Sequence, residues 1–310
     1  MGARATSPPN AWARAALWPP TCCPPCRECL QNYVETRRSR RIAPALIWTR
    51  RQNSMQSEIY SMTDIAPTIA AILNVRTPAG ALGRPIERIH RALNGSERLA
   101  LLAPDALGMH PWTLWRDEMP YLSSLIDANH VVLRAVMPTI TPVNFATMLT
   151  GGDQSVHAIA TKADDLACES IFDTLAEAGR RGASVGQEDC TMTALVGRYA
   201  HVAERLPRFE DDLVADRVIR IARTQQPDFV ITQLVTTDDV FHKHMPSSPE
   251  VIPYLHQTDD RLRLLVDALI PLGYGIMILA DHGQHDTEKG RGSHGTEADE
   301  DSLVPCTWTR

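Results

Sequence analysis

The sequence has 310 residues, of which 44% are hydrophobic and 22% are charged, and its formal net charge is −6. This composition suits one large globular domain or two small ones. The acidic balance gives no reason to expect a nucleic-acid or membrane partner. No apolar run approaches the roughly 20 residues that are needed to span a bilayer.

The first 54 residues differ from the rest of the chain. They carry nine arginines, no lysine and two glutamates, a net charge of +7, whereas the remainder carries −13. Proline pairs stand at 8–9, 19–20 and 24–25, and no helical or alternating apolar period is sustained. We therefore expect residues 1–54 to be a disordered or spuriously translated leader ahead of Met55, with an Arg-rich targeting segment as the alternative. Residues 55–310 are expected to form the catalytic domain.

The seven cysteines do not suggest a disulfide framework. The leader contains a C-x2-C-x2-C spacing, but Tyr33 stands where a ferredoxin-type run would have its fourth cysteine, and no nearby His or Cys pair closes a zinc site. The remaining cysteines are scattered singly, which favours a reducing cytoplasm. The leader cysteines are Cys22, Cys23, Cys26 and Cys29, and the others are Cys168, Cys190 and Cys306.

Apolar strand-like segments alternate with helix-like segments from Met55 onward. The expected strands are Leu99–Ala103, Val131–Val136, Ala183–Gly186, Phe229–Val235 and Ile276–Ala280, with a final strand-like segment at Leu303–Trp308. The expected helices are Ala66–Leu73, Met119–Ala128, Val143–Leu149, Ile171–Ala178, Leu213–Arg223 and Glu250–Leu269. This alternation predicts an α/β fold with a mostly parallel sheet that is covered by helices on both faces.

In such sheets, chemistry collects beyond the carboxyl ends of the strands. Three of the predicted strands are followed by a carboxylate, namely Asp105, Asp238 and Asp281. An Asp after a strand is commonly a helix cap or turn former, and for Asp105 alone that interpretation is preferred. Because the three strands deliver their acids to the same edge, we expect the carboxylates to meet.

Histidines accompany these carboxylates at spacings that suit a metal site. Asp238 and His242 are four residues apart and share one face of a helical turn, while His282 directly follows Asp281. His294 lies in a glycine-rich stretch that can fold back toward them, whereas His244 and His285 are weaker candidates. With Asp105, the set offers three carboxylates and three imidazoles, which suits two Zn²⁺ ions, with Mn²⁺ or Fe²⁺ as alternatives.

A hydroxyl nucleophile is predicted at Thr141. Thr141 followed by Pro142 fits the N-cap and first position of a helix, where backbone N–H groups and the helix dipole favour a phosphate. A neighbouring cation would lower the pKa of the hydroxyl. Asn144, one turn further, is expected to direct its amide at a phosphoryl oxygen. An ordinary capping Thr is the alternative.

These residues together resemble the alkaline phosphatase superfamily. The motifs that carry the resemblance are Asp105, the Thr-Pro-Val-Asn turn at 141–144, Thr150-Gly151, Asp238-x3-His242, Asp281-His282-Gly283 and His294-Gly295. The branch that is most similar is the type I phosphodiesterase/nucleotide pyrophosphatase group, and the stretch 236–243 looks like phosphonoacetate hydrolases. The resemblance covers about residues 55–308.

The resemblance implies a role for each matching residue. Asp238, His242 and His294 would hold one metal, while Asp105, Thr141, Asp281 and His282 would hold the other. Thr141 would attack phosphorus and form a covalent phospho-threonine, with Asn144 assisting as a catalytic residue. The implied activity is hydrolysis of a small-molecule phosphodiester, nucleotide pyrophosphate or phosphonate.

One segment departs from the pattern of the family. Ser61–Leu73 and Gly83–Ile86 resemble a stretch that usually follows the last metal-binding His, yet here they precede Asp105. This order predicts a circularly permuted segment at the N-terminal end of the fold.

Two alternatives to the hydrolase stay open. A phosphomutase of the same superfamily would need an Arg-rich second phosphate pocket, and no Arg cluster accompanies the motifs. A non-catalytic binding protein on this fold would show no metal-dependent turnover.

Overall fold

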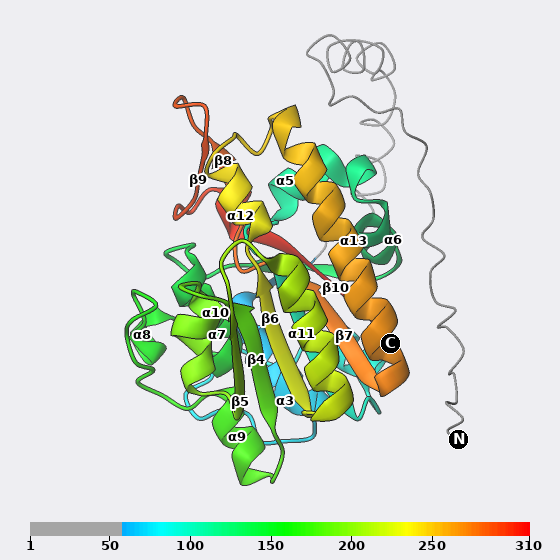
Figure 1. Ribbon diagram of the computed structural model, residues 1–310. Coiled ribbons are helices and arrows are strands. Elements are labelled where there is room, and N and C mark those ends of the chain that lie inside the picture. The colour runs from blue at the N-terminus through cyan, green and yellow to red at the C-terminus, as the bar shows by residue number, and fades with distance from the viewer. Residues whose placement is uncertain (1–57) are drawn as a thin grey trace, which may run out of the picture. The chain divides into compact units, whose positions relative to one another are not determined.

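The structure is a computed structural model that describes residues 58–310 (Figure 1). The leader predicted at residues 1–54 and its four cysteines lie outside the described residues. None of the helices between residues 58 and 310 combines the length and the apolar character that crossing a membrane requires.

Eight strands form one mixed sheet in the order β1-β3-β10-β7-β2-β6-β4-β5. The strand β10 runs antiparallel to its neighbours β3 and β7, and all other pairings are parallel. The strands are β1 (Ile59–Ser61), β2 (Arg98–Pro104), β3 (His130–Arg134), β4 (Gly182–Gln187), β5 (Val202–Leu206), β6 (Phe229–Leu234), β7 (Tyr274–Leu279) and β10 (Leu303–Thr309). A separate hairpin pairs β8 (His285–Asp286) with β9 (Gly292–Ser293).

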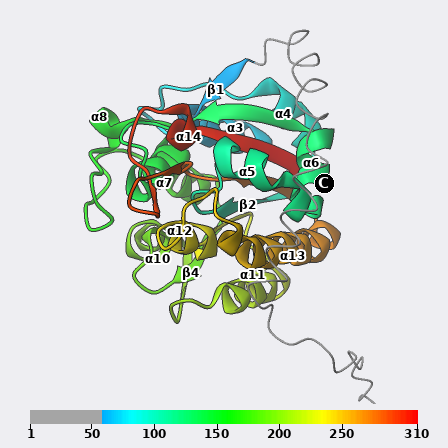
Figure 2. The ribbon, with the colours of Figure 1, turned by 90° about the horizontal axis from the view of Figure 1, so that it is seen from above.

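Helices cover both faces of the sheet, as Figure 2 shows from above. The helices α11 and α13 pack on one face, while α3 and α4 cover the other and α7 packs against α3. The longer helices are α3 (Ile65–Ile72), α4 (Glu87–Leu93), α5 (Met109–Trp115), α6 (Pro120–Ala128), α7 (Thr141–Thr150), α9 (Ile171–Glu177), α11 (Asp211–Thr224) and α13 (Ile252–Leu269). The short helices are α8 (Gln154–His157), α10 (Thr191–Ala194), α12 (Thr236–Phe241) and α14 (Asp299–Ser302). The predicted α/β fold is therefore confirmed.

The amino-acid composition of the central strands explains why they lie in the middle of the sheet. Every residue of β6 and β7 is buried, because helices cover both sides, and the mostly apolar sequences of these strands suit such a position. The helix α11 instead buries one stripe that includes Val214, Val218 and Ile221, the spacing of an amphipathic helix. The two edge strands, β1 and β5, were not predicted, since β1 has three residues and β5 is only partly buried.

The segment predicted to be permuted, Ser61–Leu73 with Gly83–Ile86, begins with the last residue of the edge strand β1 and contains α3. β1 pairs in parallel with β3, and α3 packs against α7, the helix that begins at Thr141. A carboxylate oxygen of Asp64 accepts from the N–H of Arg84 at 2.8 Å and so ties the two parts of the segment together. The segment thus supports the helix of the proposed nucleophile, while the permutation itself stays a prediction.

Two glycines allow the backbone after β7 to pack closely. A Cβ atom on Gly283 would lie 2.1 Å from the carbonyl oxygen of Glu300, and one on Gly108 would lie 2.5 Å from Cα of Gly283. Real contacts are never that short, so the backbone would have to move.

We expect Gly283→Ala to lower the free energy of unfolding by about 1–3 kcal/mol, the usual cost of overpacking. Urea denaturation measures the effect. The matched control is Gly197→Ala, because a Cβ there would meet its nearest neighbour at an ordinary 3.4 Å. Equal stability of the two variants would contradict the prediction.

Candidate metal and phosphoryl-transfer site

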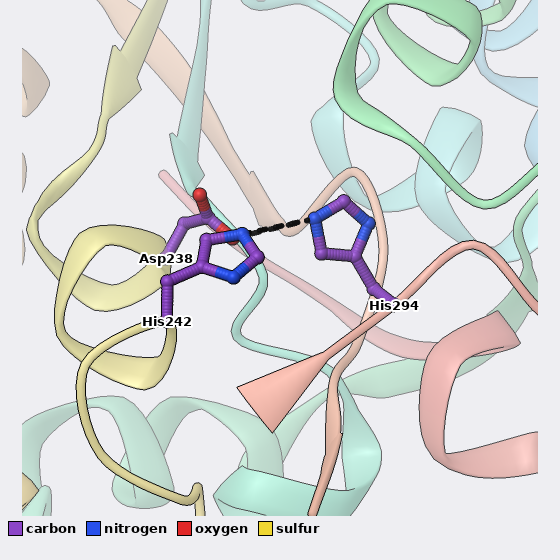
Figure 3. A group of neighbouring side chains, drawn as sticks. All are labelled: Asp238, His242 and His294. Atoms are coloured by element: carbon purple, nitrogen blue, oxygen red, sulfur yellow. Dashed lines mark hydrogen bonds and ion pairs between the residues drawn. The ribbon is translucent and has the colours of Figure 1, made fainter. Parts of the chain in front are cut away.

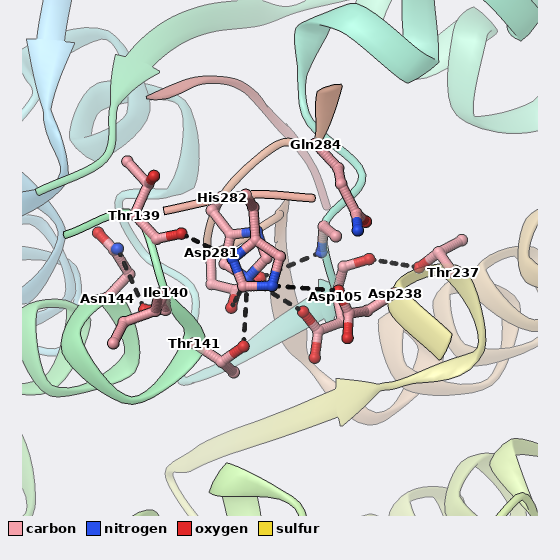
Figure 4. Close-up of polar contacts among 12 residues, drawn as sticks. Asp105, Thr139, Ile140, Thr141, Asn144, Thr237, Asp238, Asp281, His282 and Gln284 are labelled. Atoms are coloured by element: carbon pink, nitrogen blue, oxygen red, sulfur yellow. Dashed lines mark hydrogen bonds and ion pairs between the residues drawn. The ribbon is translucent and has the colours of Figure 1, made fainter. Parts of the chain in front are cut away.

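Three neighbouring strands bring their carboxyl ends to one edge of the sheet, where β7, β2 and β6 lie side by side. Asp105 follows β2, Asp238 stands in the first turn of α12 after β6, and Asp281 and His282 follow β7. Figure 4 shows these side chains gathered opposite Thr141, which comes from α7. Residues separated by up to 177 positions in the sequence therefore share one site, as the strand-end argument predicts.

The Nε2 atom of His282 is the centre of the first group. It lies 3.1 Å from Oγ1 of Thr141, 3.3 Å from Oδ2 of Asp281 and 3.6 Å from Oδ1 of Asp105. Nδ1 of the same ring lies 2.9 Å from the carbonyl oxygen of Gly283. Nδ1 therefore donates to that carbonyl, and the lone pair of Nε2 is left for a cation. A lone pair that faces two carboxylates calls for a proton or a cation between them.

A second group combines Asp238, His242 and His294 (Figure 3). Oδ1 of Asp238 lies 3.3 Å from Nε2 of His242 and 3.8 Å from Nε2 of His294, and the two Nε2 atoms are 3.2 Å apart. The ring of His294 donates from Nδ1 to the carbonyl oxygen of Thr139 at 3.0 Å, so its Nε2 also points into the group as a lone pair. The spacing of four residues between Asp238 and His242 places both on one side of the turn, as predicted.

The donor atoms fit divalent cations. Within residues 58–310, Oδ1 of Asp105, Oδ1 of Asp238 and Oδ2 of Asp281 are buried without a hydrogen-bond partner. Buried carboxylate oxygens are costly unless they are paired or coordinate a metal. In each of two overlapping groups, one with His242 and His294 and one with Asp105 and His282, all ligand atoms lie within 4.8 Å of one another, and Asp238 belongs to both. The resemblance assigned Asp238 to one metal only.

The pKa values of the neighbouring acids Asp105 and Asp238 are shifted in opposite directions. Burial and then the charges of Asp281 and Asp238 raise the pKa of Asp105 well above its usual range. Burial also acts to raise the pKa of Asp238, but its close contact with His242 and the positive charge that His282, His242 and His294 carry when protonated outweigh burial, and its pKa is lowered. Asp238 is thus the anionic centre of the cluster, whereas Asp105 is held as an anion only when a further positive charge is close.

Thr141 is the first residue of α7, and the structure corrects the prediction that it is the N-cap. Ile140 occupies the cap position and makes no side-chain capping bond. The hydroxyl of Thr141 does not cap the helix but lies beside His282. Thr141 is therefore not the ordinary capping residue that the sequence left open as the alternative.

Asn144 holds the turn before α7 together. Its Nδ2 donates to the carbonyl oxygens of Val136 at 3.1 Å and Ile140 at 3.3 Å, and its Oδ1 accepts from the N–H of Val136 at 2.8 Å. The side chain is fully buried. Since both amide hydrogens have backbone partners, Asn144 positions the residue before Thr141 and does not point its amide at the site.

Supporting residues that the sequence analysis missed surround the ligands. Gln233 donates to Oδ2 of Asp105, and Thr237 donates to its backbone carbonyl. Asp211 accepts from the N–H groups of Val235 at 3.2 Å and Thr236 at 3.0 Å, at the start of α12. Polar residues inside the buried strand β6 were a signal for Gln233, but nothing in the sequence marked Asp211.

Asp301 fixes the loop that carries His294. This carboxylate is fully buried and accepts from the N–H of Thr296 at 3.0 Å, from its hydroxyl at 2.7 Å, and from Nδ1 of His285 at 2.7 Å. His285 is therefore a support of the loop. The other weaker candidate, His244, lies 2.7 Å from a carboxylate oxygen of Glu250.

A cavity of about 200 Å³ opens beside the cluster. Its lining includes Asp105, Thr141 and Asp238 together with residues from the loops after α8, β4 and β5. The hydroxyl of Thr141 thus faces a space that a small molecule can enter.

Comparison with protein families gives one match. Residues 166–300 match the model of the type I phosphodiesterase / nucleotide pyrophosphatase family, which confirms the resemblance seen in the motifs. The matched stretch contains Asp238, His242, Asp281, His282 and His294, whereas Asp105 and Thr141 lie before it. No curated protein matches the chain.

Solved structures share the fold. Phosphonoacetate hydrolase from Sinorhizobium meliloti 1021 has 20% identity and a TM-score of 0.48, covering 61% of this chain and 57% of its own. Murine ectonucleotide pyrophosphatase / phosphodiesterase 5 has 17% identity and a TM-score of 0.52, covering 62% and 58%. The C-terminal periplasmic domain of EptC from Escherichia coli has 12% identity and a TM-score of 0.51, covering 69% and 72%. The chain spans less than two thirds of the length of the first two, and its likeness to the murine and Escherichia coli structures, at these identities, shows the fold alone.

We expect Zn²⁺ or Mn²⁺ to stabilise the chelator-treated protein, because the cation offsets the repulsion among the buried carboxylates. At about 100 times Kd the gain is about 2.7 kcal/mol, or a rise in Tm of about 5–10 °C. Differential scanning fluorimetry measures it. Asp238→Asn should lose most of the shift, and an unchanged Tm with every divalent cation would contradict the proposed metal centre.

We expect Asp301→Asn to weaken metal binding about 10- to 100-fold, because an amide cannot accept from Thr296 and His285 as the carboxylate does. Competition with a fluorescent zinc chelator measures the affinity. Asp299→Asn is the matched control, since Asp299 is exposed and pairs only with Arg134 at the surface among the described residues. Equal affinities in the two variants would show that the loop does not depend on Asp301.

Proposed function

We propose that this protein is a two-metal hydrolase of small phosphodiester, nucleotide pyrophosphate or phosphonate substrates, and that it acts through a covalent phospho-threonine at Thr141. The observation that carries the proposal is the 3.1 Å contact between Oγ1 of Thr141 and Nε2 of His282, at the centre of a buried Asp and His cluster. The family match supports this class of substrate.

The start of α7 can bind the phosphoryl group. The first hydrogen bond within the helix turn runs from the N–H of Asn144 to the carbonyl of Ile140, so the amides of Thr141 and Val143 precede the helical ladder, and Pro142 has no N–H. Such amides and the positive end of the helix dipole favour an anion next to the hydroxyl. The same helix end therefore presents the nucleophile and holds its target.

Hydrolysis proceeds in two balanced displacements at phosphorus. Oγ1 of Thr141 loses its proton to water and bonds to phosphorus, while the bond from phosphorus to the leaving group breaks and the leaving group takes a proton from water. A water molecule then adds its oxygen to phosphorus, the bond to Oγ1 breaks, and Thr141 regains a proton. The sum of the two steps is cleavage of one phosphorus bond by one water.

The residues of the site have different roles in the proposed reaction. Asp105, Asp238, Asp281, His242, His282 and His294 would hold the metals, which supply positive charge that favours the Thr141 alkoxide and the developing negative charge on phosphoryl oxygens. Asn144 fixes the turn that aims Thr141, and burial of Asp281 and His282 excludes water from their side of the site.

We expect Thr141→Ala to reduce metal-dependent hydrolysis of bis-p-nitrophenyl phosphate about 1,000-fold or more, because it removes the hydroxyl that lies beside His282 and that we propose as the nucleophile. Release of p-nitrophenolate with and without chelator measures it, and denatured wild-type enzyme trapped during turnover should carry a phosphoryl group on Thr141. Thr224→Ala, at an exposed position on α11, is the control.

Two outcomes would favour the alternatives. Retained activity in the Thr141→Ala variant would remove the covalent step. Folded wild-type protein that binds metal but releases no product from any ester would indicate a binding protein, and release only in the presence of a second phosphorylated substrate would indicate a phosphomutase.

A further inference from the structure

A buried histidine outside the proposed ligand set contacts the helix of the proposed nucleophile. His157 is the last residue of α8, and its side chain is fully buried. Its Nε2 atom lies 3.2 Å from Oγ1 of Thr147 on α7, and its Nδ1 atom accepts from the N–H of Ile159 at 3.0 Å. The hydroxyl of Thr147 donates its own proton to the carbonyl oxygen of Val143 at 3.0 Å, so it accepts the proton of Nε2. Both ring nitrogens of His157 therefore have a partner.

These contacts require a neutral ring. Nδ1 accepts from Ile159 through its lone pair, so a second proton on the ring would break this hydrogen bond and leave two N–H groups facing each other. Burial lowers the pKa of His157 to about 4, against the weaker opposing effect of the negative charge of Asp153. Its partners Thr147 and Ile159 carry no charge. His157 thus stays neutral at pH values at which an ordinary histidine is protonated.

His157 also closes the loop that follows α8. Residues 158–167, here called the cavity loop, end at Ala167, whose N–H donates to the carbonyl oxygen of His157 at 3.1 Å. At the beginning of the loop, Ile159 is fully buried and packs in a small apolar cluster with Ala146 of α7. His157 therefore holds both ends of the cavity loop, and its ring joins them to α7.

The cavity loop contributes to the lining of the proposed substrate cavity. Lys162 lies in this loop and lines the same cavity as Thr141. Near the end of the loop, the N–H of Leu166 donates to the hydroxyl of Tyr199 at 2.7 Å. The loop thus lies between α7 and the segment after α10, and its position affects the shape of the cavity.

We propose that His157 is a positioning residue, whose neutral imidazole fixes the cavity loop to the helix of the nucleophile and so holds part of the cavity lining in place. Only the kinetic consequence rests on the proposed function, because the attachment of the loop is a property of the folded chain. The partner of the ring on α7 is Thr147, more than one helical turn beyond Thr141. Loss of the ring should therefore loosen the lining while Thr141 stays beside His282.

Hydrogen exchange in the metal-free full chain tests the attachment without turnover. His157→Ala should speed up exchange in the cavity loop, including the amide of Ile159, about tenfold, the factor of one lost hydrogen bond. His157→Asn should restore much of this protection, because an Asn oxygen can accept from the N–H two residues further on. His256→Ala, at an exposed position on α13, is the control and should leave exchange in the loop unchanged.

Nuclear magnetic resonance tests the neutral state in the wild type and needs no variant. The ring C–H resonances of His157 should stay constant between about pH 7.5 and about pH 5, a range in which a histidine with an ordinary pKa titrates. His256 provides the reference, since it is exposed.

Steady-state hydrolysis of bis-p-nitrophenyl phosphate by the metal-loaded full chain tests the kinetic consequence. His157→Ala should raise KM about 3- to 10-fold, the factor of one hydrogen bond, and leave kcat within about twofold. Thr147→Val removes the partner of the ring and should have a similar effect on KM. Because the two side chains act through one hydrogen bond, the double variant should show no further increase.

Three outcomes would overturn the proposal. They are titration of His157 near pH 6.5, unchanged exchange of the cavity loop in His157→Ala, and a fall in kcat at unchanged KM, which would place the effect on the nucleophile and not on the lining. If the loop depends on His157 but the wild type cleaves no ester, the proposed function alone would be refuted.

Discussion

Mutual repulsion among Asp105, Asp238 and Asp281 is the constraint around which this fold is organised. Parallel strands that lie side by side deliver the three carboxylates to one edge, and an oxygen of each is buried without a hydrogen bond from the described residues. Charges that are removed from water and left unpaired cost several kcal/mol. The arrangement is favourable only with compensating positive charge, so occupancy of the site and stability of the fold are coupled.

The proposed metal ligands owe their positions to residues outside the proposed ligand set. Gln233 orients Asp105, Asp211 fixes the start of α12, and Asp301 ties down the loop of His294. Each support is a buried polar group with hydrogen-bond partners on backbone or side chains, and such groups hold geometry firmly because leaving them unpaired is costly. The rigid surroundings allow donor atoms to stay close even though they repel one another.

Much of this site could be predicted from the sequence, since its main signals are local. Runs of apolar residues mark β2, β6 and β7, an acid follows each of them, and Asp238 and His242 have helical spacing. The predictions that were wrong concern residues whose roles depend on tertiary contacts. The hydroxyl of Thr141 bonds to His282 across the site, so the helix begins one residue earlier than capping rules suggest, and Asn144 uses its amide on Val136. Asp301 and Gln187 join distant segments of the chain through side-chain hydrogen bonds, and no sequence pattern marks such residues.

The strand β10 has a consequence for how the molecule comes into being. It lies between β3 and β7 and pairs with both, yet it follows both along the chain. While the ribosome makes the chain, these two strands emerge with open edges that have no native partner until residues 303–309 appear. The nascent sheet therefore carries a gap between β3 and β7, and the unpaired backbone groups on these two strands can pair with other chains until β10 fills it.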